Sequence, residues 1–272
     1  MKLPDVDSCA DDSVRALSLA KYRKRAARYD STVGPTWSIR QRAVAALQLE
    51  PGQTVLDVGC GTGLSLALLR AAVGDAGRVY GVDQSPHMLA HAHRRVAAAG
   101  WRNVHVFESP AQSLTLTEPV DAMLFHYTHD ILRSTTALPQ LLACARAGTS
   151  IAIAGVKYFP RWLSPLNVWV YLKNRAYNGS PGQLHTPWDR IAPHVDNWQF
   201  TPTQFGMGYL ASGRLGVRAA CSAVDVGAVH AKAAQRGAAW LEHDDRAAAS
   251  PIATAHPHHL LGPARAASPG SR

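Results

Sequence analysis

Short apolar runs alternate with longer helix-patterned segments through much of this 272-residue chain. Five runs rich in Val, Ile, Leu and Phe predict buried strands. They lie at residues 54–58, 78–82, 103–107, 120–125 and 149–154. Because helical segments separate them, the strands are expected to form a parallel sheet with right-handed crossovers. Ligands of such sheets bind beyond the carboxyl ends of the strands, so the loops after the first four strands should line one cleft.

Helix signals lie on both sides of these strands. Trp37–Leu49 predicts a helix that leads into the first strand. Ser85-Pro86 opens another helix, with serine at the cap and proline in the first turn, and Gly100 ends it. After the fifth strand, a further helix is expected to begin at Pro187-Trp-Asp-Arg190. The last two strands are expected at residues 198–201 and 205–214.

A glycine-rich turn follows the first strand, in the stretch Thr54–Gly63. Three glycines stand at alternate positions, which suits a tight turn that lets a ligand lie against bare backbone. The helix after the turn presents unpaired amide N–H groups to that ligand. The dinucleotide fingerprint is G-x-G-x-x-G, whereas the spacing here is G-x-G-x-G, with Asp57 just before it. The second strand ends in Asp83, which is well placed to bind ribose hydroxyls.

The combination D-V-G-C-G-T-G and then G-V-D-Q-S resembles the class I S-adenosylmethionine-dependent methyltransferases. The likeness is nearest to their small-molecule and lipid branch, the ubiquinone and menaquinone type, and covers roughly residues 20–214. It implies a Rossmann-like, doubly wound α/β fold with a seven-stranded sheet, mostly parallel with an antiparallel last strand. It also implies S-adenosyl-L-methionine as cofactor. The cofactor-binding residues implied are Asp57, Gly59, Cys60, Gly61, Gly63, Asp83, Gln84, Met88, Ala111 and His126.

Two of these positions need a qualification. Cys60 lies within the glycine turn, where filling space is expected more than reactivity. In the third-strand loop many relatives have Gly-Asp-Ala, with the acid on the adenine amino group, but this chain has Pro110 in place of that acid. Adenine recognition must then use backbone groups near Ala111 or the side chains of Ser109 or Gln112. Glu108 is a less favoured substitute.

His126 is the first candidate for a catalytic role, because the loop after the fourth strand begins where the transferable methyl should lie. Histidine titrates near neutral pH, so His126 is expected to orient the substrate or act as a general base. A hydrogen-bonded structural histidine is an equally good interpretation. Tyr127, Thr128 and His129 compete for the same position. His129-Asp130 is a weaker candidate pair, because adjacent helix residues do not face each other.

The N-terminal segment carries a second catalytic candidate. A helix is expected at residues 13–28, followed by Tyr29-Asp30. In the resembled family a Tyr-Asp pair near the N-terminus often lies in a segment that closes over cofactor and substrate, so Tyr22 and Tyr29 are candidate lid residues. Ordinary packing of a tyrosine is the alternative for each.

Residues 156–196 are unusually aromatic and include Trp162 and Trp169. This insertion is interpreted as a substrate cover or as core, with an interfacial membrane anchor as a further possibility. The acceptor is accordingly expected to be a small molecule or lipid, with carbon, nitrogen and oxygen acceptors all open. A membrane-associated phospholipid N-methyltransferase, a non-catalytic cofactor-binding module and a nicotinamide-dependent oxidoreductase are the alternatives.

Composition narrows the partners and the compartment. The net charge of +9 includes no continuous basic block, so no nucleic acid is expected. The cluster at residues 21–28 is interpreted as a solvated helix face, with peripheral attraction to an anionic membrane as second choice. Four scattered cysteines predict no metal site. An acidic N-terminus and the lack of a long apolar run favour a cytoplasmic protein. Residues 1–214 are expected to form the methyltransferase domain, and residues 215–272 a poorly ordered tail.

Overall fold

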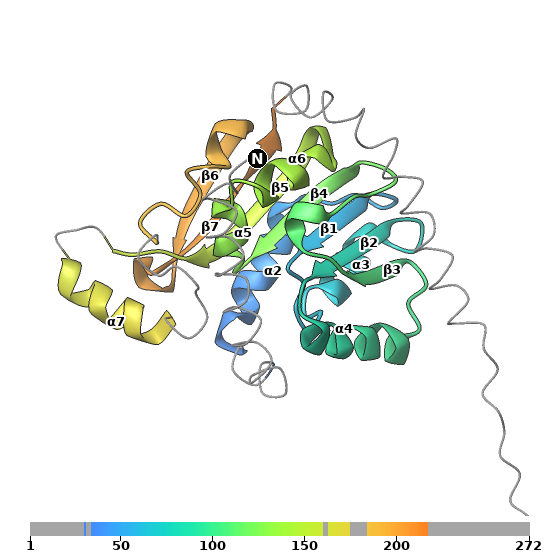
Figure 1. The fold of residues 1–272 in the computed structure, drawn as a ribbon, viewed down its shortest axis with the longest axis horizontal. Coiled ribbons are helices and arrows are strands. Elements are labelled where there is room, and N and C mark those ends of the chain that lie inside the picture. Colours follow the sequence, from blue (N-terminus) through green and yellow to red (C-terminus); the bar gives the residue numbers. More distant parts are fainter. Residues whose placement is uncertain (1–29, 31–33, 160–162, 175–183, 217–272) are drawn as a thin grey trace, which may run out of the picture.

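The computed structural model describes residue 30 and residues 34–159, 163–174 and 184–216. Seven strands form one sheet in the order β3-β2-β1-β4-β5-β7-β6 (Figure 1). They span Thr54–Val58 (β1), Arg78–Asp83 (β2), Val104–Glu108 (β3), Val120–His126 (β4), Ala145–Val156 (β5), Val195–Thr203 (β6) and Gly208–Leu215 (β7). The first five strands are parallel, and β7 is antiparallel to both of its neighbours. The predicted fold class is therefore confirmed.

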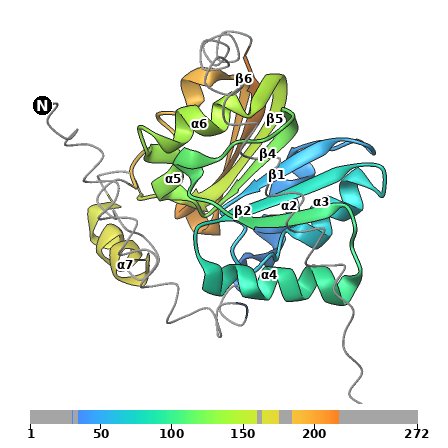
Figure 2. The same cartoon turned by 45° about the vertical axis from the view of Figure 1, so that its right-hand side comes forward.

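Helices cover the sheet on both faces, as Figure 2 shows. One face packs against α2 (Trp37–Ala46), α3 (Leu66–Val73) and α4 (Pro86–Ala99). The other face packs against α5 (His129–Arg133) and α6 (Ala137–Ala143). Short 3-10 helices lie at Gly34–Thr36, Ala111–Ser113, Ala192–His194 and Gln204–Gly206. This three-layer arrangement explains the continuous apolar runs of β1 and β4, because both faces of these central strands are buried.

The termini of α4 follow the sequence signals. The Ser85 hydroxyl accepts a hydrogen bond from the Met88 amide at 3.5 Å, and Pro86 occupies the first turn. Gly100 ends the helix in the left-handed conformation, with φ of 65°. These cap residues set where α4 begins and ends. The helix therefore begins just after the carboxyl end of β2, where the candidate site lies.

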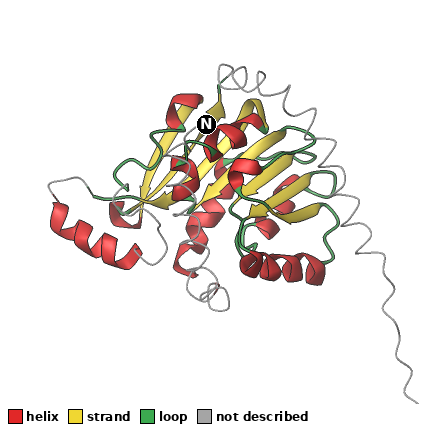
Figure 3. Cartoon of the chain, in the orientation of Figure 1, coloured by secondary structure: helices red, strands yellow, loops and turns green. Residues whose placement is uncertain are grey.

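Helix α7 (Ser164–Asn174) stands apart from the two helical layers, beyond the ends of β5 and β7 (Figure 3). It contributes one fully buried side chain, Val170, to a small apolar cluster with Val156, Tyr158, Leu184 and Met207. Tyr127 and Phe159 pack against the edge of this cluster. The aromatic insertion is thus attached to the carboxyl edge of the sheet through a core of its own.

Several predicted boundaries were wrong. No helix begins at Pro187: residues 187–191 form a turn, because the chain enters the 3-10 helix at Ala192 and then β6 at once. The last strand starts at Gly208 and not at Phe205, since Gln204, Phe205 and Gly206 have φ of 48°, 57° and 91°. The fifth strand starts earlier, at Ala145, and the third one residue later. The first helix ends at Ala46, before Gln48 with φ of 49°.

Some sequence predictions fall outside the described residues. They include the helix at 13–28, both lid tyrosines, Trp162 and the tail beyond Gly216. Within the described ranges, none of the helices combines the length and the apolar character needed to cross a membrane.

Candidate functional site

The glycine turn after β1 has the backbone that its spacing predicts. Gly59, Gly61 and Gly63 have φ of 68°, 58° and 81°, in the left-handed region that favours glycine. A Cβ on Gly59 would stand 2.6 Å from the methyl carbon of Thr128, and one on Gly63 would stand 2.8 Å from Leu66. The turn therefore lies directly between the loop after β4 and the start of α3.

Asp83 joins the loops after β1 and β2. Its two carboxylate oxygens accept hydrogen bonds from the amides of Gly61 (3.0 Å) and Ser85 (2.8 Å). Burial raises the pKa of Asp83, these backbone donors oppose that rise, and the charge of Glu108 adds to it. The Gln84 amide adds a third backbone hydrogen bond, and because a carboxylate has about four lone-pair sites, Asp83 keeps capacity for a hydroxyl donor at this edge.

Asp57 is a buried carboxylate with an open oxygen. Only 1% of its surface is exposed, and Oδ2 has no hydrogen-bond partner among the described residues. Burial raises the pKa of Asp57 to about 7; Arg40 opposes the rise, Asp83 adds to it and a hydrogen bond with Ser65 opposes it. An open, desolvated carboxylate of this kind is matched by a cationic ligand group.

Arg40 is a site residue that the sequence analysis missed. It lies on the buried side of α2, and its Nη1 donates to the hydroxyl of Ser65 at 2.5 Å. Its charge acts on both Asp57 and His126. The signal was present in the sequence, because Ala43 and Val44 place the apolar face of the helix at the same side as Arg40.

His126 ends β4 and is almost fully buried, with Nε2 unpartnered among the described residues. Burial lowers the pKa of His126 well below its usual value, and the charge of Arg40 lowers it further. The imidazole is therefore neutral near pH 7. The next residue, Tyr127, has φ of 63°, a strained conformation for a residue with a large side chain. Its ring centre lies 4.8 Å from that of His126.

His129, unlike His126, is hydrogen-bonded through its Nε2 to the backbone of a neighbouring strand. Its Nε2 accepts a hydrogen bond from the Val156 amide at 3.1 Å, and the ring lies directly over Gly155 of β5. Burial lowers the pKa of His129 to about 4. Its ring centre is 6.2 Å from that of Tyr209 on β7. His129 thus connects α5 to β5 and β7, and one of its nitrogens is occupied by that contact.

The remaining predicted cofactor residues lie around the same edge. Cys60 is buried, and its sulfur would be 3.1 Å from a Cβ on Gly81, so it fills the space between the turn and β2. Met88 lies against Gly61, with its Cε 3.4 Å from where a Cβ would be. Gln84 is half-buried between Asp83 and the cap of α4.

The third-strand loop reaches the site through backbone contacts. The Ser109 amide donates to the Asp83 carbonyl at 3.1 Å, and Glu108 is paired with Asp83 in the register of β3 and β2. Glu108 is exposed. Pro110 caps the short helix that begins at Ala111, and Ala111 is buried. The loop therefore contributes a proline-fixed turn at the place where the acid was expected.

Asp30 ties the N-terminal segment to the glycine turn. Its carboxylate accepts hydrogen bonds from the Thr62 hydroxyl (2.6 Å) and from Arg95 Nη2 (2.7 Å). Arg95 Nε in turn donates to the Thr62 carbonyl at 3.2 Å. Three bonds thus close a ring around Thr62, the residue between Gly61 and Gly63. We call Asp30, Thr62 and Arg95 the clasp; Tyr29, which precedes it, lies outside the described residues.

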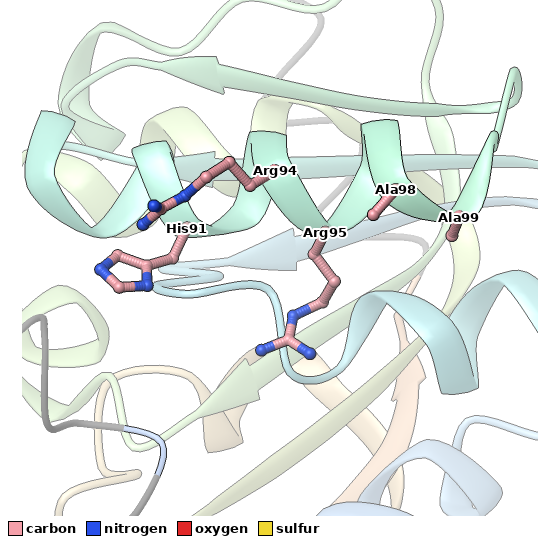
Figure 4. A pocket seen from close by; sticks show the side chains of 5 residues that line it. All are labelled: His91, Arg94, Arg95, Ala98 and Ala99. Atoms are coloured by element: carbon pink, nitrogen blue, oxygen red, sulfur yellow. The ribbon is translucent and has the colours of Figure 1, made fainter. Parts of the chain in front are cut away.

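A surface hollow lies on the outer side of α4. Its volume is about 460 Å³, and it is lined by His91, Arg94, Arg95, Ala98 and Ala99 (Figure 4). Arg95 belongs both to this wall and to the clasp, whereas no predicted site residue lines the hollow. Across the described ranges, no group of three or more His, Cys, Asp or Glu side chains is placed to hold a metal ion.

Comparisons with known proteins agree with this site. A family model described as a methyltransferase domain matches residues 55–148. Demethylmenaquinone methyltransferase of Shouchella clausii is 37% identical over 90 residues, 33% of this chain and 37% of that protein. A probable cobalt-precorrin-6B C(15)-methyltransferase (decarboxylating) of Saccharolobus solfataricus is 36% identical over 86 residues, 30% of this chain and 43% of that protein. The chain spans less than half the length of these curated relatives.

A solved structure extends the likeness to most of the fold. The N-methyltransferase NodS from Bradyrhizobium japonicum, in complex with S-adenosyl-L-homocysteine, superposes with a TM-score of 0.55. The superposition covers 73% of this chain and 98% of that chain at 13% identity, which supports the shared fold. Over residues 55–148 the chain is thus similar to the S-adenosylmethionine-dependent methyltransferases. S-adenosylmethionine is the methyl donor of this family.

The side chains at the carboxyl edge fit that donor. The open, buried oxygen of Asp57 can accept from the ammonium group of the donor. The buried, positively charged guanidinium of Arg40 can pair with the donor's carboxylate. The pair is thus complementary to the amino-acid end of the donor. Asp83 retains acceptor capacity for a ribose hydroxyl. The matched residues 55–148 include the glycine turn, Asp83 and His126, and end before α7.

Proposed function

We propose that the protein transfers the methyl group of S-adenosylmethionine to a small-molecule or lipidic acceptor. The observation that carries the proposal is the glycine turn, closed onto Asp83 and flanked by the open oxygen of Asp57. Residues 1–214 would form the catalytic domain, with residues 156–196 as a cover over the acceptor. When bound, the donor supplies an electrophilic methyl group, so the protein's part is alignment and exclusion of water.

In this proposal each predicted residue has a defined part. Asp57 and Arg40 hold the two charged groups at the amino-acid end. Asp83 accepts from a ribose hydroxyl, and Gln84 and Met88 border the ribose and adenine. Backbone groups near Ala111 read the adenine in place of the missing acid. Gly59, Cys60, Gly61 and Gly63 shape the turn against which the donor lies.

His126 is proposed to receive the proton of the acceptor. Its ring is neutral because burial lowers its pKa, and Nε2 has no partner among the described residues. When the donor is bound, Nε2 would take up the proton that the acceptor atom loses as its electron pair forms the bond to the methyl carbon, with the sulfur leaving as a neutral thioether. A positioned base of this kind contributes about 10²- to 10⁴-fold in rate. Tyr29 remains a proposed lid residue, since the clasp anchors its neighbour Asp30 at the glycine turn.

The proposed acceptor class, a small molecule or lipid, is supported by the names of two relatives. The names of the two relatives described above refer to demethylmenaquinone and to a cobalt-precorrin, both small molecules. The alignments cover a third of this chain or less. The absence of a nucleic-acid partner and a cytoplasmic location stay predictions, as does the choice among carbon, nitrogen and oxygen acceptors.

The decisive experiment supplies methyl-labelled S-adenosylmethionine and purified protein to a small-molecule and lipid extract, with nucleic acids in a separate reaction. The expected result is one labelled small molecule or lipid, formed by the wild type and absent with Asp83→Ala. Labelled RNA or DNA would contradict the acceptor class. Binding of S-adenosylhomocysteine without any labelled product would favour the non-catalytic module, and binding of NAD instead would favour an oxidoreductase.

A further inference from the structure

Exposed apolar side chains are concentrated at one end of the described molecule. Eight large hydrophobic residues of the described ranges are exposed, and six of them belong to α7 or to the turn between β6 and β7. These six are Leu166, Val168, Trp169, Tyr171, Leu172 and Phe205. We call them the apolar projection. The other two, Trp37 and Phe200, lie on different elements.

One small core holds the two parts of the projection together. Val170 of α7 and Met207, next to the β6–β7 turn, are buried in the same apolar cluster. Phe159 packs on that cluster and lies 3.4 Å from where a Cβ on Gly206 would be. Helix and turn are therefore neighbours in space, at the carboxyl edge of the sheet. Solitary exposed hydrophobics need no explanation, but a group of six around one core indicates an interaction surface.

The backbone of the turn supports the same conclusion. Phe205 is fully exposed and has φ of 57°, so a bulky side chain is held in a strained conformation while pointing into water. Neither burial nor local geometry among the described residues accounts for phenylalanine at that position. Strain of this kind, where the fold gains nothing from it, is found at functional sites.

Charge indicates the partner. From residue 131 to residue 188 the sequence contains no Asp or Glu. The same stretch contains Arg133, Arg146, Lys157, Arg161, Lys173 and Arg175. Four of these cations fall between residues 157 and 175, immediately around α7. Two copies of so basic a segment would repel each other in a symmetric dimer, where each meets its own copy. An anionic surface is complementary to the positive charge of this segment.

We propose that the apolar projection docks this protein on an anionic lipid interface. Trp and Tyr suit the boundary between acyl chains and water, and Leu, Val and Phe suit the layer beneath. Nearby Lys and Arg attract acidic headgroups, and each contributes about a fivefold gain in membrane partition. The projection shares its core with Tyr127, whose neighbour His126 is the proposed base. If the proposed methyl transfer holds, an acceptor dissolved in the membrane reaches His126 from this end.

The test is flotation of the full-length protein with vesicles of phosphatidylcholine, alone or mixed with phosphatidylglycerol. The expected result is flotation with the mixed vesicles, several-fold weaker with phosphatidylcholine alone, and weakened by high salt because exposed charges are screened. Trp169→Ala should reduce binding by about tenfold, since it removes most of a large apolar contact. Trp37→Ala is the matched control, because Trp37 is 41% exposed and Trp169 is 52% exposed. The control should float as the wild type does.

Phe205→Asn keeps the test independent of folding. Asparagine tolerates the left-handed conformation better than phenylalanine, so this variant should be at least as stable as the wild type. It should nevertheless bind the mixed vesicles several-fold more weakly. Equal flotation of wild type, Trp169→Ala and Phe205→Asn would overturn the proposal. So would a concentration-dependent dimer of the wild type that either variant dissociates. Titration with S-adenosylhomocysteine reports separately on the methyltransferase site, so the two proposals fail independently.

Discussion

Two regions of the molecule meet at the carboxyl edge of the sheet and differ in how they are built. In the proposed cofactor region, residues 54–113, hydrogen bonds from the backbone amides of Gly61 and Ser85 to the Asp83 carboxylate join the turn to the cap of α4. In the proposed acceptor region, the described part of residues 126–216, helix α7 and the strained turn between β6 and β7 expose large apolar side chains. The matched family model spans residues 55–148, so it covers the first region from Val55 on and only the beginning of the second.

This difference shows what the fold determines. A parallel sheet delivers its ligand to the ends of β1 and β2 whatever the acceptor is, so local backbone requirements define the cofactor region. The acceptor region has to fit a partner outside the chain, and its geometry is not dictated by the sheet. Variants on each side should therefore separate donor binding from turnover.

The largest expected effect is on turnover, at the border of the two regions. His126→Asn should lower kcat by about 100-fold or more, because it removes the proposed base. The affinity for S-adenosylhomocysteine should stay within about threefold of wild type. Steady-state kinetics with the identified acceptor and calorimetric titration measure the two. A loss of affinity with unchanged kcat would place His126 in the cofactor region instead.

A loss of stability is expected where His129 of α5 packs against β5. Gly155→Ala should reduce the free energy of unfolding by roughly 1–3 kcal/mol, because a Cβ there would overlap the ring of His129. Urea denaturation measures the change. Gly34→Ala is the matched control, since a Cβ on Gly34 has no atom within 4 Å, and its effect should be within about 0.5 kcal/mol. If both variants have the stability of the wild type, His129 does not hold β5.

In the cofactor region, pH should control affinity through Asp57. Burial raises its pKa from 3.8 to about 7, so its contribution to the stability of the free protein is full below pH 3.8 and lost as the pH rises through 7. A cationic ligand group favours the ionised carboxylate. Affinity for S-adenosylhomocysteine should thus increase by roughly tenfold from pH 6 to pH 8. Asp57→Asn should abolish this dependence, and an equally steep profile in that variant would contradict the role given to Asp57.

The smallest expected effect concerns the clasp. Asp30→Asn keeps an oxygen for Thr62 but loses the ion pair with Arg95, which is partly exposed. Affinity for S-adenosylhomocysteine should fall by about two- to fivefold at low salt, with little difference at high salt. Asp75→Asn, which breaks the exposed ion pair with Arg70, is the control and should leave affinity unchanged. The same loss in both variants would show that the clasp has no specific effect on the site.

The sequence predicted the backbone of residues 54–113 well, for a physical reason. Alternate glycines, the serine cap and the acid at a strand end are local requirements of the backbone, so a short stretch states them completely. The helix pattern shows that Arg40 lies on the buried side of α2, but it does not show which residues Arg40 faces. Arg40 was missed because these residues, Asp57 and Ser65, are distant in the sequence. The helix predicted at Pro187 failed because the position of β6 leaves room only for a turn. No local pattern reveals that Phe205 has a left-handed backbone.

The most direct test of the account is calorimetric titration of wild type and Asp83→Ala with S-adenosylhomocysteine and, separately, with NAD. The account predicts saturable binding of S-adenosylhomocysteine by the wild type and no binding of NAD. It also predicts a loss of about 100-fold or more in Asp83→Ala, because two hydrogen bonds to a charged group are removed. Wild-type affinity in Asp83→Ala, or binding of NAD alone, would contradict it.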